Sequence, residues 1–243
     1  AFIVKKAGDI DMVSTGTQIT VNNEIMVYQS YDEETGLLTV KRGALDTVPQ
    51  NHLAGSVLYF ADDFITVDPT EYVTGEIINV KALTTTPSGI LDLDDTEAQQ
   101  VEIQARAIRP YPLANVKIND VYWPTKIETD LVLTWVDRNR IQQTGGSILG
   151  WYEGGVAIES GTQTHLILTQ LDENDLELAT TNANLTGTTS YTFPISSMQT
   201  DARKVRVILK TLRDGYECLQ PFEYTVELSQ FFSAPYDLIV EFK

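Results

Sequence analysis

The stretch TQITVNNEIMVYQSYDEETGLLTVKRG, residues 17–43, predicts three short β-strands joined by two tight turns. Val, Ile, Thr and Tyr alternate with polar residues in its apolar runs, which is typical of strands with one buried face. Asn22-Asn23 and the segment 32–36 supply the residues that turns prefer. The stretch therefore indicates an antiparallel β-meander.

The same pattern continues along the rest of the chain, where strand-like runs alternate with polar turns. The runs are SVLYFADDFITV, GEIINVKALTTT, VEIQARAI, LVLTWVDRNR, THLILTQLDEN, DLELATTNA, TSYTFPI, KVRVILKTLRDG and FEYTVELS. Only LDDTEAQQ and ISSMQTDA have a helical character, and each is a turn or two long. We therefore expect an all-β fold.

A proline-rich segment, RPYPLANVKIND, predicts a domain boundary near residue 109. Residues 1–108 are expected to form a small β-barrel or meander domain, and residues 109–230 a β-sandwich. Residues 231–243 would be a further strand or a packing segment. The residues expected to fill the core of the sandwich are Trp135, Val205, Val207 and Leu209.

The formal net charge of −17 is spread over the whole chain, with 17 acids and 6 bases in residues 1–107 and 17 acids and 11 bases in residues 108–243. Such a surface repels nucleic acid and anionic lipid. Membrane insertion is not expected, because no apolar run approaches the ~20 residues of a spanning helix. The single Cys218 cannot form an intramolecular disulfide, which fits synthesis in the cytoplasm. Because the strand-like FIV stands at its start, we interpret the sequence as a piece of a longer polypeptide.

The loop after residue 43 allows a chemical and a structural interpretation. Asp46 and His52 could form an acid–base pair, with Thr47 as the nucleophile. Alternatively, the loop is structural: Gly43 and Gly55 supply unusual backbone angles, and Pro49 stiffens the chain. Asp46 or Thr47 would then hydrogen-bond nearby amides, and His52 would hold the loop through its own hydrogen bonds. A nucleophile elbow or a glycine loop at a helix start is not present. We favour a connector.

Other chemistry has little support in the residues. The two histidines lie far apart, and with one cysteine they give no zinc spacing. The acidic turns DLDDTEAQQ and DENDLE lack the spacing of a calcium loop, and solvated turns explain them better. We therefore predict a protein that is not an enzyme and has no catalytic residue, no cofactor and no metal site.

Aromatic residues give the candidate contact surface. Trp151 and Tyr152 lie in the Gly-rich segment 141–163, where they either contact a partner or a sugar or fold back onto the sheet. We rate the two alternatives equally. Phe231, Phe232 and Tyr236 follow the last predicted strand, and we expect them to pack against a neighbouring domain or subunit or to begin a further strand.

Two resemblances add to these expectations. The second half resembles a fibronectin type III (immunoglobulin-like) sandwich. LVLTWVDRN matches the second strand with its core Trp135, THLILTQLDENDLEL matches the C–C′ pair, TSYTFPI matches strand E, and KVRVILKTLRDGYECLQPFEYTVEL matches strands F and G. The insertion at 141–163 is longer than usual between strands B and C.

The loop of the first half is similar to a segment of the tail-tip, or host-specificity, proteins of tailed bacteriophages and gene transfer agents. The matching residues are Arg42, Gly43, Leu45, Asp46, Thr47, Pro49, His52 and Gly55. DPTEYVTGEIINVKALTTTPSGILDL and RPYPLANVKIND continue the similarity, which spans most of residues 15–228.

The resemblance implies a virion structural protein of the tail, a baseplate or tail-tip part without chemistry of its own. Its partners would be other tail proteins and further copies of itself, with a host-surface receptor or glycan as a further contact. Two alternatives remain open. One is a bacterial surface or secreted adhesion module that binds carbohydrate through the aromatic residues of the Gly-rich loop. The other is an accessory domain of a polysaccharide-degrading enzyme.

Overall fold

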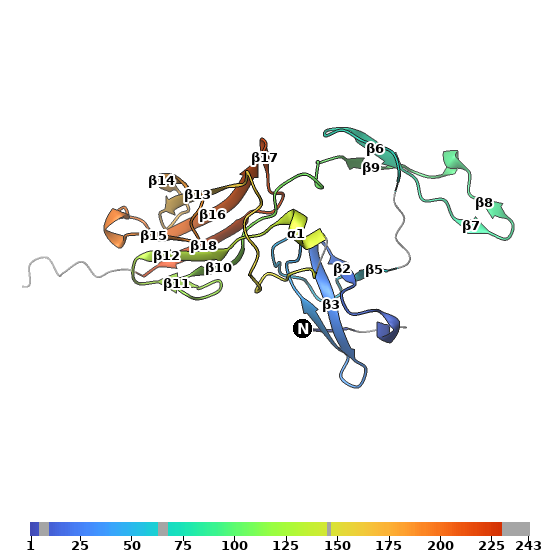
Figure 1. Ribbon diagram of the computed structural model, residues 1–243, viewed down its shortest axis with the longest axis horizontal. Coiled ribbons are helices and arrows are strands. Elements are labelled where there is room, and N and C mark those ends of the chain that lie inside the picture. Colours follow the sequence, from blue (N-terminus) through green and yellow to red (C-terminus); the bar gives the residue numbers. More distant parts are fainter. Residues whose placement is uncertain (5–9, 63–67, 145–146, 230–243) are drawn as a thin grey trace, which may run out of the picture. The chain divides into compact units, whose positions relative to one another are not determined.

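The computed structural model describes residues 1–4, 10–62, 68–144 and 147–229 (Figure 1). The chain divides into two compact units: unit 1 contains Ala1–Asp63 and Pro110–Lys243, and unit 2 is Phe64–Arg109. Unit 2 is thus inserted in the sequence of unit 1. The region 1–108, which the sequence predicts as one domain, contains residues of both units.

The expected all-β class is confirmed. The described residues form mostly antiparallel sheets, and they contain a single short α-helix, α1 (Arg140–Thr144). The two helical candidates are each one 3-10 turn, at Leu93–Asp95 and Ile195–Ser197. None of the helices in the described part of the chain has the length and apolar character needed to cross a membrane.

The N-terminal sheet of unit 1 contains the predicted meander. Its five strands pair in the order β1-β4-β3-β2-β5. Their bounds are β1 Phe2–Ile3, β2 Gln18–Val21, β3 Glu24–Asp32, β4 Leu37–Lys41 and β5 Tyr59–Ala61. All four pairings are antiparallel. The alternation in the sequence places one set of side chains in a small core, formed by Ile10, Ile19, Val21, Met26, Tyr28 and Leu38.

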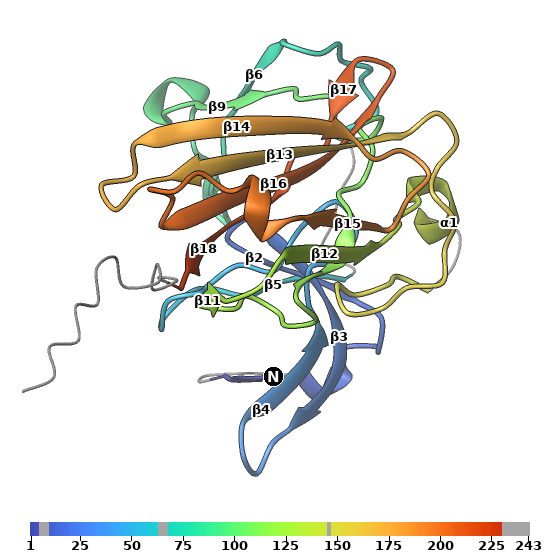
Figure 2. The same cartoon turned by 90° about the vertical axis from the view of Figure 1, so that its left-hand side faces the viewer.

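The second half of unit 1 contains two further sheets (Figure 2). The three-stranded sheet has the order β10-β12-β15, with bounds Ala114–Ile118, Leu131–Val136 and Ser190–Phe193. The six-stranded sheet has the order β11-β18-β16-β13-β14, and β17 also pairs with β16. Its bounds are β11 Lys126–Ile127, β13 Gln163–Leu171, β14 Glu177–Asn184, β16 Lys204–Arg213, β17 Tyr216–Glu217 and β18 Phe222–Leu228. The β11–β18 pair is parallel.

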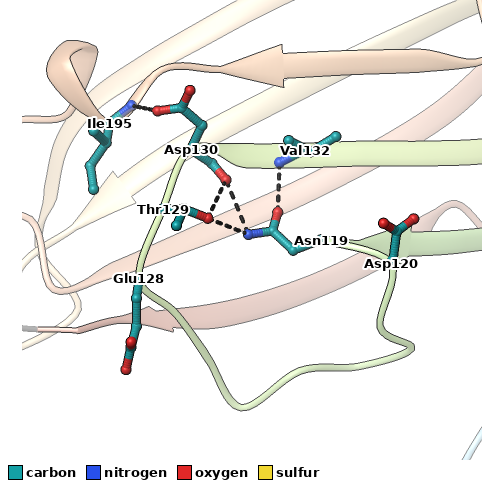
Figure 3. A pocket seen from close by; sticks show the side chains of 7 residues that line it. All are labelled: Asn119, Asp120, Glu128, Thr129, Asp130, Val132 and Ile195. Carbon is teal, nitrogen blue, oxygen red and sulfur yellow. Dashed lines mark hydrogen bonds between the residues drawn. The ribbon is translucent and has the colours of Figure 1, made fainter.

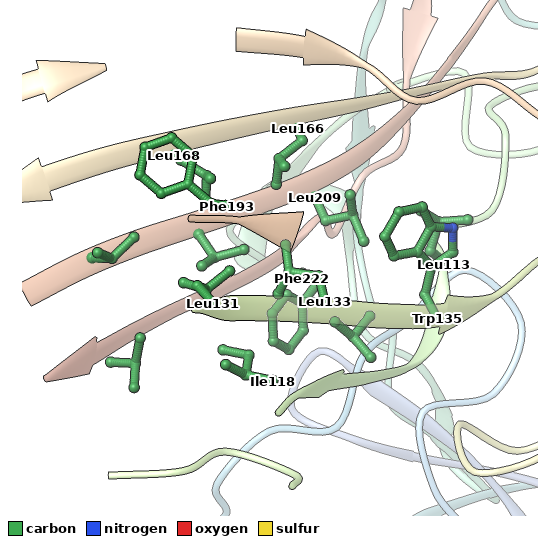
Figure 4. Close-up of a cluster of buried hydrophobic side chains, with 14 of the residues drawn as sticks. Leu113, Ile118, Leu131, Leu133, Trp135, Leu166, Leu168, Phe193, Leu209 and Phe222 are labelled. Carbon is green, nitrogen blue, oxygen red and sulfur yellow. The ribbon is translucent and has the colours of Figure 1, made fainter. Parts of the chain in front are cut away.

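One hydrophobic core lies between these two sheets (Figure 4). Every second residue of β12 and β16 is buried, as expected for strands with one face toward a core. The four core residues expected from the sequence are all buried: Trp135, Val205, Val207 and Leu209. Leu131 and Leu133 of one sheet belong to the same cluster as Leu166 and Leu168 of the other.

Unit 2 contains two separate two-stranded ladders. β6 (Ile77–Val80) pairs with β9 (Gln99–Glu102), and β7 (Thr85–Thr86) pairs with β8 (Gly89–Ile90). Both pairs are antiparallel. Among the residues of this unit that the structure describes, 68–109, none is buried. The described part of unit 2 therefore has strands without a core of its own.

Candidate functional site

The loop that follows β4 is organised around the carboxylate of Glu24. This residue begins β3 directly after the Asn22-Asn23 turn, and its side chain is completely buried. Arg42 binds it with two nitrogens, Nε to Oε1 at 3.0 Å and a terminal nitrogen to Oε2 at 2.5 Å. This two-point contact fixes both partners more firmly than a single ion pair.

Three further groups of the loop converge on the same carboxylate. The main-chain N–H of Gly43 donates to Oε1 and that of Gln50 to Oε2, both at 2.9 Å. His52 Nε2 lies 2.8 Å from Oε2, while Asn22 Nδ2 lies 3.1 Å from His52 Nδ1. An amide donor at Nδ1 favours the tautomer in which Nε2 carries the proton and donates to Glu24.

Glu24 thus receives five contacts, more than the roughly four lone-pair positions of a carboxylate. A carboxylate with its lone pairs so occupied is poorly placed to accept a proton from a substrate. The arrangement holds a loop closed, since residues 42, 43, 50 and 52 are tied to one buried point. We name this arrangement the Glu24 cluster.

The remaining polar residues of the loop bond the main chain. Thr47 Oγ1 donates to the carbonyl of Ala44 at 2.7 Å and accepts from the N–H of Ile25 at 3.1 Å. His52 bonds Glu24 and Asn22, and neither Thr47 nor Asp46 is its partner. Asp46 is itself buried. The contacts thus match the structural interpretation of Thr47 and His52.

The ring of Pro49 packs directly against the backbone of Gly43 at the start of the loop. Gly43 has φ of +54°, and a Cβ at this position would lie 2.6 Å from Cδ of Pro49. Gly55 also has a positive φ, +93°. Only glycine adopts such angles at little cost, and only glycine leaves room for the proline ring. Both glycines therefore act as the sequence suggested.

The loop also connects the N-terminal sheet to the second half of unit 1. Gln220 accepts from the N–H of Val48 at 3.0 Å and donates to the carbonyl of Asn23 at 2.6 Å. The N–H of Trp151 donates to the carbonyl of Arg42 at 2.6 Å. Lys41 and Glu153 form an ion pair at 3.0 Å. The loop is thus a junction within unit 1.

Arg138 is the most deeply buried cation at this junction. Its terminal nitrogens donate to the carbonyls of Leu149 at 3.1 Å and Gly43 at 3.2 Å. Desolvation lowers the pKa of its guanidinium to about 10, against the opposing effect of Glu153. Arg138 therefore remains charged at neutral pH and bonds carbonyls on both sides of the junction.

Trp151 occupies the core and not an exposed loop, so its expected role in a contact surface needs correction. Its side chain is completely buried and stacks on Phe222, with ring centroids 6.1 Å apart. Trp151 could have contacted a partner or sugar or packed against the sheet, and in the structure its ring packs against the sheet. Near the far end of the Gly-rich segment, the buried Glu159 pairs with Arg140 and Arg213.

Tyr152 remains accessible and lies in a small aromatic cluster. Its side chain is 47% exposed, and its ring meets Tyr122 edge-on at 5.1 Å and Trp123 at 6.4 Å between centroids. Lys117 Nζ lies 5.1 Å from the centre of the Tyr122 ring. Tyr122 and Trp123 were not expected from the sequence as site residues. Their Tyr-Trp-Pro sequence before a short strand was the available signal.

The other expected contact residues, Phe231, Phe232 and Tyr236, lie outside the described residues. Glu24, the residue that organises the loop, was also not expected from the sequence. Acidic residues are seldom buried completely, and a Glu beside a hairpin turn looks like a solvated one. The signal was the Arg-Gly pair on the neighbouring strand end, which can satisfy a buried carboxylate.

A hollow with a volume of about 710 Å³ lies beside the start of β12 (Figure 3). Its polar groups mostly bond one another. Asn119 donates to Thr129 and to the carbonyl of Asp130, and it accepts from the N–H of Val132. Asp130 Oδ1 accepts from the N–H of Ile195 at 2.8 Å. These bonds hold the turn before β12, and the carboxylates of Asp120 and Glu128 complete the lining of the hollow.

Within the described parts of the chain, no group of three or more His, Cys, Asp or Glu side chains is close enough to hold a metal ion. The chain was also compared with known proteins. No protein-family model matches it, and no curated protein is significantly similar to it.

Proposed function

We propose that the chain is a non-enzymatic structural component of a phage or prophage tail tip or baseplate. In this role it spaces and presents domains near the host surface through protein–protein contacts. The proposal rests on the order of the motifs that are similar to tail-tip proteins. They run along the sequence from Arg42 to Gly55 and continue to the segment RPYPLANVKIND. Several residues of that set, Arg42, Gly43, Pro49 and His52, serve to hold one loop around Glu24.

A finer fold assignment is part of the proposal: a small barrel or meander built on the N-terminal sheet, β1 to β5, and a fibronectin type III-like sandwich over 109–230. It is supported by the strand pairing of the second half. The strands assigned to B and E lie in one sheet, beside β10 in the position of A. Those assigned to G, F, C and C′ are adjacent in the other, as β18-β16-β13-β14. Immunoglobulin-like sandwiches divide their strands in this way.

The test is the location of the chain in particles. Antibodies raised against the purified chain are expected to label one end of tailed particles from the organism that encodes it. Light scattering of the purified chain adds the oligomeric state, for which a stable ring or trimer is expected. Labelling of the cell surface with no signal on particles would contradict the proposal.

A second candidate function is carbohydrate binding by an adhesion module, and the Tyr122, Trp123 and Tyr152 cluster favours it. Aromatic rings that are partly exposed stack on the apolar faces of sugars. Titration with bacterial surface glycans would then show saturable binding that Tyr152→Ala removes. Trp151→Ala is not a useful probe here, because loss of this core ring is expected to cost about 3–5 kcal/mol of stability.

A further inference from the structure

Unit 2 has an apolar strand face that its described residues leave uncovered. In the β6–β9 pair, Ile78 lies opposite Val101, and Val80 lies opposite Gln99. Ile103 continues the ladder through its hydrogen bonds with Glu76 and Gly75. Since side chains alternate along a strand, Ile78, Val80, Val101 and Ile103 share one side. We name this side the β6–β9 face.

The exposure of this face is high for apolar side chains in a ladder. Val80 is 50% and Val101 48% exposed, Ile78 and Ile103 are partly buried, and none of the residues described between 68 and 109 is fully buried. A two-stranded hairpin is marginally stable in water, and it needs a third strand or a packed surface for independent stability. The β6–β9 pair therefore lacks the burial that would hold it in place.

The charge of unit 2 indicates what kind of surface would cover the face. Residues 68–109 contain eight acids and three bases. In β9, Glu102 lies on the side opposite to Val101 and Ile103. Glu76 directly precedes β6, and Asp92, Asp94, Asp95 and Glu97 precede β9. A second copy of this chain would bring more carboxylates to the same place, and like charges oppose contact. A basic surface would be attracted to it.

We propose that the β6–β9 face docks a partner protein whose surface combines apolar side chains with lysine or arginine. The outer edges of β6 and β9 pair with no other described strand, so a strand of the partner can extend the ladder. Apolar contact then supplies most of the affinity, and the acidic charge of unit 2 selects for basic residues. This proposal does not rest on the proposed function.

The test uses the whole chain and a peptide that imitates such a partner strand. The probe is a labelled peptide of four Lys-Val repeats, and its charge-reversed control contains four Glu-Val repeats. Binding is followed by fluorescence anisotropy. The variant is Val80→Thr/Val101→Thr, which removes apolar surface while keeping shape and strand preference. The matched control is Val57→Thr/Val121→Thr, at two valines of unit 1 that are 58% and 52% exposed.

Saturable binding of the Lys-Val peptide is expected, with affinity at least about fivefold weaker in Val80→Thr/Val101→Thr and unchanged in the control variant. The Glu-Val peptide should not bind. No binding of the Lys-Val peptide, or equal binding by both variants, would overturn the proposal. Two further results would also overturn it: self-association that the variant abolishes, and a lower unfolding midpoint of the free variant. The first would assign the face to a second copy, and the second to the chain's own contacts.

Discussion

The Glu24 cluster and the β6–β9 pair differ in what holds their strands in place. In the cluster, one buried carboxylate receives five hydrogen-bonding contacts from a single loop, next to a hydrophobic core. In the β6–β9 pair, four apolar side chains share a side, but no residue of the described part of unit 2 is buried. Regular β-ladders alone therefore do not indicate where the stability of this chain resides.

The largest effect is expected from Glu24→Gln. The new glutamine side chain would leave Arg42 without its counter-charge, and its NH₂ group would face the N–H donors that now bind the carboxylate. The variant should therefore lose about 3–5 kcal/mol of unfolding free energy. Chemical denaturation followed by tryptophan fluorescence measures this loss. As a control, Glu217→Gln removes the half-exposed pair with Lys210 and should change stability by no more than about 1 kcal/mol. Equal losses in both variants would contradict the central role of Glu24.

The second prediction compares a leucine in each unit. Leu38 is completely buried in the core of the N-terminal sheet, whereas Leu93 of unit 2 is 58% exposed. Leu38→Ala should cost about 2–5 kcal/mol, because it leaves a cavity. Leu93→Ala should stay within about 0.5 kcal/mol. Denaturation midpoints measure both, and a comparable loss for Leu93→Ala would mean that unit 2 has a core.

The smallest effect is a difference in acid sensitivity between Asp172 and Asp68. Hydrogen bonds from the N–H groups of Leu176 and Asn174 hold the pKa of Asp172 below its ordinary value of 3.8. In Asp68, the Tyr72 hydroxyl and the Thr70 N–H lower the pKa in the same way. A carboxyl with a lowered folded-state pKa adds stability above its unfolded pKa and loses it as the pH falls through the folded one.

Asp172→Asn should therefore reduce the loss of stability as the pH falls below the ordinary pKa of 3.8, as measured by the unfolding midpoint at each pH. Asp68→Asn should leave the same curve unchanged, because its hydrogen bonds lie in a unit whose described residues, 68–109, include none that is buried. If Asp68→Asn changed the curve as much as Asp172→Asn, the two units would unfold together.

The sequence predicted the fold better than the site. Alternation and turn residues located the strands now seen as β2, β3 and β4, and they placed Trp135 and Val207 in the core. The contacts of Trp151 with Arg42 and Phe222 could not be predicted, because they join residues far apart in the sequence. The burial of Glu24 was missed for a related reason, since its donors arrive from the end of the next strand and the loop beyond it.

The strands of unit 2 show a different limit. GEIINV and QQVE have apolar residues at strand spacing, and the pattern is the same whether a strand covers a core or stands uncovered. Periodicity reports which side chains share a face, but it does not report what lies against that face. The difference between the units therefore became visible only from burial.

The insertion of unit 2 in the sequence of unit 1 has an evolutionary consequence. The entropy of closing a loop grows slowly with its length, so unit 1 can tolerate segments of different lengths and compositions between residues 63 and 110. The scaffold of unit 1 therefore does not depend on the particular segment that fills this position. A chain with residues 68–105 replaced by a Gly-Ser linker of equal length should therefore keep the unfolding midpoint of unit 1.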